Sequence, residues 1–381
     1  MLQIDHIYEF LYQELFKDFE FCHLFNGVPD ANLSNISVFT QTKYPSTKIF
    51  FYDQEPLIPL FVDPYVNKLT KDPRTSILVT SEVSDDVDAY TELKKLYYFF
   101  HGFAALDWYR GYYALNSNKS IVKPYKYDFI SMNRIINNDR SYRIYFVSLL
   151  KELRLLDKGL VSFNVTDNQF DDWQDEVADP NSKLSEQAKQ HIETHLIDVN
   201  KLVIDSASLP GSASANIPRT IDRIDYNNDT LNVDSFWNIV TETVFYYDKL
   251  HLTEKIFKPI VSKQPFMLIA APGNLAYLKR YGFKTFNSVI DENYDNMQDN
   301  DLRIQAVVKQ LQWYCDLTPG EKTDIIQQLE PIIDYNFHHF YGEFRHIITS
   351  ELLDNTKTLF QSIGYDDHHI NYSNIHQALT H

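Results

Sequence analysis

The chain has 381 residues, more than one ordinary hydrophobic core accommodates, and this length favours two domains. Hydrophobic residues make up 44% of it and aromatic residues 15%, which excludes a largely disordered chain. The formal net charge of −17 excludes a protein that coats nucleic acid non-specifically, because such a surface repels polyanions at long range. The net charge does not exclude an enzyme that contacts DNA through one local basic groove.

The cysteine content and the apolar windows indicate a cytoplasmic protein. Cys22 and Cys315 are too far apart in sequence to form a disulfide framework, so a reducing compartment is expected. The N-terminal residues mix charges into their apolar pattern, unlike a signal peptide. No window supplies the roughly 20 uncharged apolar residues of a membrane span. No zinc pattern is recognised, and we expect no metal.

The first third of the chain predicts an open α/β sheet. Apolar residues from Ile4 to Leu15 follow helical spacing and predict an amphipathic helix. Short apolar runs bounded by turn residues then predict strands at Ile36–Thr40, Lys48–Tyr52, Ser76–Thr80 and Leu96–Phe100. The polar stretch Tyr112–Lys126 is interpreted as the crossing between domains.

The rest of the chain predicts a second α/β domain. Strands are expected at Asp128–Met132, Phe236–Thr243 and Pro265–Ala271, with a further strand starting at Phe283–Phe286, and helices at Arg140–Leu156, Thr253–Ser262, Leu275–Tyr281, Leu302–Leu317 and Lys322–Phe344. Gly282 suits a helix C-terminus. Predicted boundaries are 1–118 for the first domain, 119–126 for the linker, 127–345 for the second domain with an irregular insertion at 167–226, and 346–381 for a terminal helix and a weakly ordered tail from Tyr365.

One short helix in the second domain carries a possible phosphate site. Thr253 is a good N-cap, and Lys255 and Lys258 follow in the first turns. Cations at a helix start cost about 0.3–1 kcal/mol each unless an anion neutralises them. A bound diphosphate would reverse that sign, and Glu254 suits a ribose diol. The alternative is a solvated helix end with ordinary surface charges.

Three arginines follow the strand expected at Asp128–Met132. Arg134, Arg140 and Arg143 would lie at the carboxyl edge of a parallel sheet, where open α/β sheets bind ligands. Arginine makes bidentate contacts to phosphate, so these residues are candidate donor-binding groups. The alternative is a basic helix start that pairs with surface acids.

Two groups of residues in the first domain are candidates for the acceptor side. Asp53 and Glu55 follow a buried strand, and either carboxylate suits a general base that takes the proton from an acceptor hydroxyl. The alternative is a turn before a proline-rich loop. His101, Trp108 and Arg110 follow another expected strand and suit an acceptor wall, although core aromatic residues with a surface arginine explain them equally well. The DxD string at 86–88 is interpreted as a solvated charge run, not as a metal site.

The stretch LHLTEKIFKPIVSKQPFMLIAAPGNLAYLKRYGFKTF resembles the donor-binding core of the inverting α-1,3-fucosyltransferases, whose outline exostosin-like enzymes share. A similar layout recurs in phage and bacterial proteins labelled glycosyltransferase. The resemblance implies a GT-B fold, in which two Rossmann-like domains face a cleft, and no essential metal. It implies that Glu254 holds ribose, Lys255 the diphosphate, Arg140 or Arg143 a phosphate, and that Glu55 is the base.

The chain departs from that pattern at two places. His251 stands two residues before Thr253 where the family has tyrosine, with Tyr246 and Tyr247 further back, and Pro265-Phe266-Met267 replaces Pro-Val-Val. The sequence therefore does not decide the sugar of the donor or its nucleotide, which would be of the UDP or the GDP type.

The sequence thus predicts an inverting hexosyl- or pentosyltransferase that uses a nucleotide sugar as co-substrate and has no other cofactor. Its acceptor would be a hydroxymethylated base in phage DNA, which implies the host cytoplasm, or a bacterial surface-glycan precursor. The alternatives are a non-catalytic nucleotide-sugar- or carbohydrate-binding protein on the same scaffold, and a hydrolase or phosphorylase.

Overall fold

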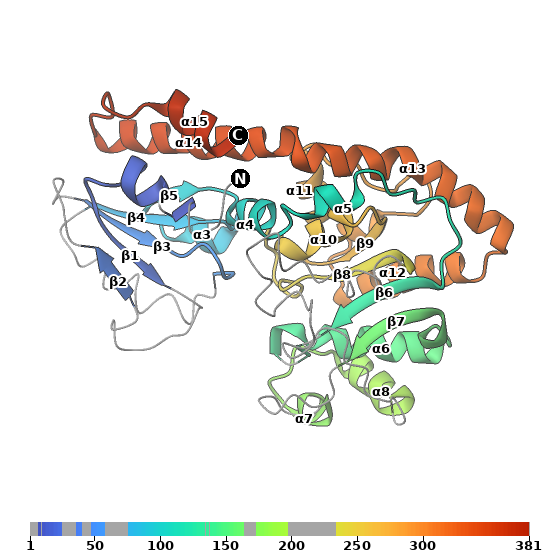
Figure 1. Ribbon diagram of the computed structural model, residues 1–381. Coiled ribbons are helices and arrows are strands. Elements are labelled where there is room, and N and C mark those ends of the chain that lie inside the picture. Colours follow the sequence, from blue (N-terminus) through green and yellow to red (C-terminus); the bar gives the residue numbers. More distant parts are fainter. Residues whose placement is uncertain are drawn as a thin grey trace. The chain divides into compact units, whose positions relative to one another are not determined.

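The computed structural model describes residues 7–8, 10–24, 36–39, 47–57, 75–133, 135–136, 138–163, 173–196 and 234–380. The chain divides into two compact units. The first unit comprises Met1–Arg110, Lys249–His251 and Tyr341–His381, and the second comprises Gly111–Asp248 and Leu252–Phe340. Both units are built on sheets of mainly parallel strands, so the chain has a mixed α/β fold (Figure 1).

The first unit contains a five-stranded sheet of order β2-β1-β3-β4-β5. Its strands are β1 (Glu20–Leu24), β2 (Ile36–Phe39), β3 (Thr47–Phe51), β4 (Thr75–Thr80) and β5 (Lys94–Tyr97). Strand β2 pairs antiparallel with β1, and the other pairs are parallel. The helices are the π-helix η1 (Leu11–Leu15), α3 (Asp85–Ala89), α4 (Phe100–Trp108), α14 (Glu343–Ile363) and α15 (Tyr372–Thr380).

Helices cover both faces of this sheet. Neighbouring residues of β3 point to opposite faces, so the contacts of Phe50 and Phe51 show which helix packs on each face. Phe50 packs in a cluster with Val87 of α3. The ring of Phe51 lies 5.9 Å from that of Phe16, which in turn contacts Phe360 of α14. Figure 1 shows α14 running along the sheet, with α15 packed against α14.

The second unit contains a four-stranded parallel sheet of order β7-β6-β8-β9. Its strands are β6 (Tyr127–Asn133), β7 (Gly159–Phe163), β8 (Ser235–Thr241) and β9 (Phe266–Ile269). Its α-helices are α5 (Tyr112–Asn116), α6 (Tyr142–Glu152), α7 (Trp173–Ala178), α8 (Glu186–His195), α10 (Phe257–Val261), α11 (Asn274–Arg280), α12 (Asn300–Cys315) and α13 (Pro319–Tyr341). Short 3₁₀-helices are η3 (Asn138–Arg140), η4 (Leu156–Lys158), η6 (Glu254–Ile256) and η7 (Asn293–Asn296).

Most of the strands expected from the sequence are confirmed, and four other expectations are corrected. The strand expected at Leu96–Phe100 ends at Tyr97, and Phe100 begins α4. Phe283–Phe286 forms no strand. The tail expected to be weakly ordered contains α15, whose apolar face packs on α14. The insertion expected to be irregular contains α7 and α8, although 167–172 and 197–226 lie outside the described residues.

Gly282 ends α11 as expected. Its φ of 88° lies in the left-handed region that glycine adopts without strain. A Cβ atom there would lie 2.7 Å from the imidazole of His339, so the close approach also requires glycine. Within the described part of the chain, no helix is long and apolar enough to cross a membrane.

Candidate donor site at the carboxyl ends of β6 and β8

The candidate site lies at the point where the strand order of the second sheet reverses. Strand β6 is the first strand of the unit, and the chain continues from it to β7 on one side and to β8 on the other. In open α/β sheets, ligands bind outside the carboxyl ends of the strands at such a point. The two strand ends are joined there by Thr241, whose hydroxyl donates to Asn133 Oδ1 over 3.1 Å.

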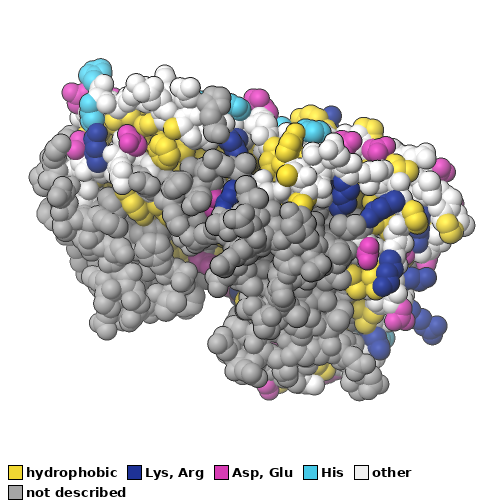
Figure 2. All heavy atoms as spheres, viewed as in Figure 1, with side chains coloured by type: hydrophobic (Ala, Val, Ile, Leu, Met, Phe, Trp, Pro, Cys, Tyr) yellow, Lys and Arg dark blue, Asp and Glu magenta, His cyan; other side chains and the backbone are white. Residues whose placement is uncertain are grey.

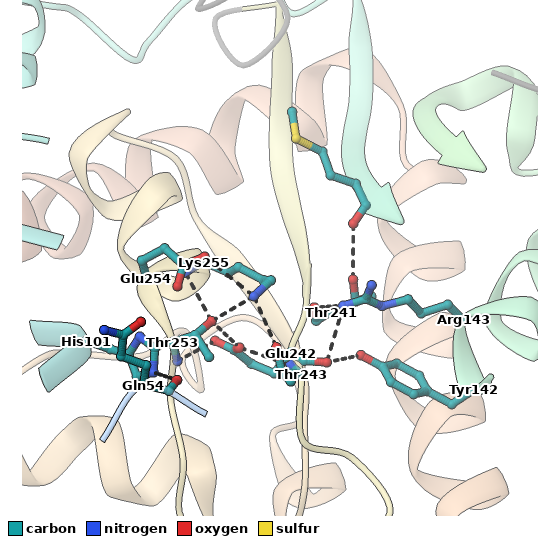
Figure 3. Close-up of polar contacts among 11 residues, drawn as sticks. Gln54, His101, Tyr142, Arg143, Thr241, Glu242, Thr243, Thr253, Glu254 and Lys255 are labelled. Atoms are coloured by element: carbon teal, nitrogen blue, oxygen red, sulfur yellow. Dashed lines mark hydrogen bonds and ion pairs between the residues drawn. The ribbon is translucent and has the colours of Figure 1, made fainter. Parts of the chain in front are cut away.

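Arg143 of α6 fastens these strand ends from inside the protein. One terminal nitrogen donates to the carbonyl of Thr241 over 2.7 Å (Figure 3). The other donates to the carbonyl of Ile135 over 2.8 Å. The side chain is buried. These contacts support a structural role for Arg143, and they leave the half-exposed Arg140 of η3 as the better candidate for a ligand phosphate. Arg134 lies outside the described residues.

Glu242, the residue after β8, is a buried carboxylate that the sequence reasoning missed. Its Oε2 accepts from the hydroxyl of Thr253 over 2.6 Å, and its Oε1 accepts from the backbone N–H of Thr253 over 3.2 Å. The acid therefore ties the end of β8 to the start of η6. No clear signal for it was present in the sequence, because the strand expected at Phe236–Thr243 includes Glu242, whereas β8 ends at Thr241.

Lys255 completes what we call the strand-end cluster: Glu242, Thr243, Thr253, Glu254 and Lys255. The Lys255 ammonium donates to Thr253 Oγ1 over 3.1 Å and to Thr243 Oγ1 over 3.2 Å, and lies 3.6 Å from Glu254 Oε1. Figure 3 shows these side chains directed toward one another. The Lys255 side chain is 33% exposed, so its charge is held in place and still reaches solvent.

The helix that follows is shorter and less regular than expected. Thr253 is the N-cap, as predicted, and its hydroxyl accepts from the N–H of Lys255 over 3.4 Å. The chain then forms one 3₁₀ turn and a five-residue α-helix. Such a short element has a weak dipole, so an anion here would depend on side chains more than on the helix. The side chain of Lys258 contacts Tyr112: its ammonium donates to Tyr112 OH and lies 4.2 Å from the centroid of that ring.

The neighbouring helix α11 offers no comparable anion site. The carboxylate of Asp295 accepts from the N–H groups of Leu275 and Ala276 over 2.9 and 3.0 Å. This side chain satisfies the donors that a phosphate would otherwise use. Burial raises the pKa of Asp295, while these two hydrogen bonds oppose that shift.

Tyr246 connects the loop after β8 to the start of α6. Its hydroxyl hydrogen-bonds with Ser141 Oγ at 2.9 Å. Burial raises the pKa of Tyr246 well above its ordinary value, so the phenol stays neutral and can offer a hydrogen bond. Tyr247 beside it donates to Asp139 over 3.0 Å.

In the first unit, the two candidate bases differ in accessibility. Asp53 is 1% exposed, and its carboxylate accepts from the hydroxyls of Tyr98 and Tyr8. Burial and the Asp53 charge raise the pKa values of both tyrosines, so both remain donors. Glu55 is exposed. Of the two, only Glu55 has a carboxylate open to an acceptor.

The first unit also brings His101 and His251 together. Their ring centroids lie 5.1 Å apart, edge to face, and His101 Nε2 hydrogen-bonds with the carbonyl of Gln54 at 2.9 Å. His251 therefore belongs to a different unit from the strand-end cluster. His101 lies on α4 with Trp108, not at a strand end. Arg110 forms an ion pair of 2.6 Å with Asp107, so this arginine is engaged within its own helix end.

The whole DxD string at 86–88 lies in α3, which Ser84 caps. Asp86 pairs at 2.7 Å with the buried ammonium of Lys249, which also lies 2.9 Å from Glu82. Asp88 is exposed. Asp86, whose side chain is 40% exposed, is thus solvated and also paired with a buried lysine. Lys249 is a further residue that the sequence reasoning missed.

The chain matches no protein-family model, no curated protein and no solved structure.

Proposed function

We propose that the chain is an inverting glycosyltransferase of the GT-B type. In this proposal, the strand-end cluster of the second unit holds a nucleotide sugar, and no metal takes part. The supporting observation is the Lys255 ammonium, which two threonine hydroxyls hold at the switch point of a parallel sheet while it stays partly exposed. A fixed cation at this place suits a diphosphate.

Each residue of the proposed site has a separate role in the reaction. Glu55 takes the proton of the acceptor hydroxyl, whose oxygen attacks the anomeric carbon of the sugar. The nucleoside diphosphate leaves, and Lys255 stabilises the negative charge that develops on it. Glu254 holds the ribose diol, and Arg140 contacts a phosphate.

Two acceptor classes fit this chemistry: a hydroxymethylated base in DNA and a surface-glycan precursor. On the face drawn in Figure 2, Asp and Glu side chains lie among the Lys and Arg side chains of the described residues, so the charges on this face do not favour either acceptor class. A labelled donor offered with hydroxymethylated duplex DNA, unmodified duplex or simple saccharides distinguishes the two classes by the product that carries label.

A donor screen tests the proposal directly. A nucleotide sugar at about 100 times its dissociation constant should stabilise the protein by about 2.7 kcal/mol, seen as a rise in melting temperature. UDP-, GDP-, CMP- and dTDP-sugars are compared. The absence of any shift across all four classes would contradict donor binding.

The variant Lys255→Ala tests the assigned position. We expect donor binding to weaken by about 1.5–3 kcal/mol, because a charge-assisted contact to phosphate is lost. Isothermal titration measures the change. The control is Lys279→Ala, which removes a 43% exposed lysine of α11 that pairs with Glu292. Equal affinity in the two variants would show that the donor does not contact Lys255.

A further inference from the structure

Helices α6 and α8 of the second unit bring three metal-ligand side chains together. Glu152 ends α6, and His191 and His195 stand one turn apart on α8. Ligand atoms of all three lie within 4.8 Å of one another. His191 Nε2 is 3.0 Å from Glu152 Oε2, and the two imidazole centroids are 4.4 Å apart.

The hydrogen bonds around His191 fix which ring nitrogen carries hydrogen. Ser148 is fully buried, and its hydroxyl donates its one hydrogen to the carbonyl of Tyr145 over 2.7 Å. The same oxygen lies 3.0 Å from His191 Nδ1 and must therefore accept from Nδ1–H. The lone pair of a neutral His191 would then be at Nε2, facing a carboxylate oxygen.

In this tautomer, His191 Nε2 and Glu152 Oε2 are two acceptors 3.0 Å apart, an arrangement that a cation beside both atoms would stabilise. A proton on Nε2 would join only His191 and Glu152. A metal ion uses all three side chains. Zinc–ligand distances of roughly 2.0–2.2 Å and a tetrahedral angle place two ligand atoms about 3.4 Å apart. The separation between His191 Nε2 and Glu152 Oε2 is 3.0 Å, and all three ligand atoms lie within 4.8 Å of one another.

The surroundings suit a metal-bound histidine. Such a histidine commonly donates its other N–H to a neighbouring oxygen, which fixes the ring, and Ser148 supplies that oxygen. Paired histidines at positions i and i+4 present both imidazoles on one face of a helix. The edge-to-face contact with Tyr145, at 5.4 Å between centroids, holds the ring from a second side.

We propose that Glu152, His191 and His195 bind one divalent transition metal ion of the zinc type, with water as the fourth ligand. Nitrogen and carboxylate ligands in this number suit zinc and its neighbours. The site lies at the far end of α6 from Tyr142, whose hydroxyl donates to the carbonyl of Glu242, and an 11-residue helix spans about 16 Å. The ion therefore fastens α8 to α6 at a distance from the strand-end cluster.

Metal titration of the full chain tests the site without any assay of activity. After chelator treatment, the protein is titrated with Co²⁺ and then with Zn²⁺. We expect one equivalent of Co²⁺ with the intense visible absorption of a four-coordinate ion, displaced by one equivalent of Zn²⁺. Zinc should also raise the melting temperature.

The variants assign the ligands. His195→Ala and Glu152→Gln should abolish the stoichiometric absorption, and Ser148→Ala should weaken binding by roughly 10- to 100-fold. Glu193→Gln, on an exposed position of α8, and His376→Ala, from a histidine pair with 5.6 Å between centroids, should bind as the wild type does. Circular dichroism confirms that each variant is folded. No stoichiometric absorption in the wild type, or unchanged binding in Glu152→Gln and His195→Ala, overturns the proposal.

Discussion

The two units treat the acidic residues that follow their central strands in the same way. In the first unit, Asp53 is buried and accepts from tyrosine hydroxyls, and Glu55 is exposed. In the second unit, Glu242 is buried and accepts from Thr253, and Glu254 is partly exposed. The carboxylate nearest the strand thus holds the loop, and the later one is more exposed. In our proposal, the later acid of each pair is the one that meets a ligand.

The largest expected effect tests this division in the first unit. Glu55→Gln should lower kcat by about 10²- to 10⁴-fold with little change in donor affinity, because a general base is lost while binding contacts remain. Initial rates with saturating donor measure it. Glu92→Gln, at another exposed position of the same unit, is the matched control. An unchanged rate in Glu55→Gln would remove its assignment as the base.

A smaller effect, on the free energy of unfolding, is expected when either of the two buried carboxylates, Glu242 or Asp53, is replaced by its amide. Glu242→Gln should lower the free energy of unfolding by about 1–3 kcal/mol, because the new amide would face either the N–H of Thr253 or that of Thr243. Asp53→Asn should cost less, since the tyrosine hydroxyls around it can rotate and accept. Urea denaturation measures both. A larger loss of unfolding free energy in Asp53→Asn than in Glu242→Gln would contradict this expectation.

The smallest effect separates the two arginines. Arg140→Ala should weaken donor binding by about 1.5 kcal/mol and leave stability near that of the wild type. Arg143→Ala should instead lower stability, because the carbonyls of Ile135 and Thr241 lose their donors. Titration calorimetry and thermal unfolding of both variants give the comparison. A stability loss in Arg140→Ala larger than its loss of affinity would contradict the assignment.

Much of the fold followed from local patterns. Buried strands such as Ser76–Thr80 and Pro265–Ala271 are short apolar runs between turn residues, and the structure has β4 and β9 there. Leu96–Phe100 misled because its aromatic residues suit a strand and a buried helix equally. Phe283–Phe286 is buried at its two phenylalanines and looks like a strand in sequence, yet it has no strand partner among the described residues.

The candidate site was predictable in type but not in detail. Position after a strand drew attention to Asp53, and the expected helix start drew attention to Thr253, Glu254 and Lys255. Neither pattern revealed that Arg143 binds carbonyls, because that depends on where α6 packs. The pair His191 and His195 was present in the sequence, but its third partner, Glu152, stands 39 positions away on another helix.

The three residues Lys249–His251 have a practical consequence. They belong to the first unit, although the chain on both sides of them belongs to the second. Lys249 supplies the buried positive charge that Glu82 requires, so a fragment ending near residue 110 would leave that acid uncompensated in its interior. Gene fragments cut at a single border would therefore give an unstable first half, and biochemical dissection of the protein should keep the polypeptide whole.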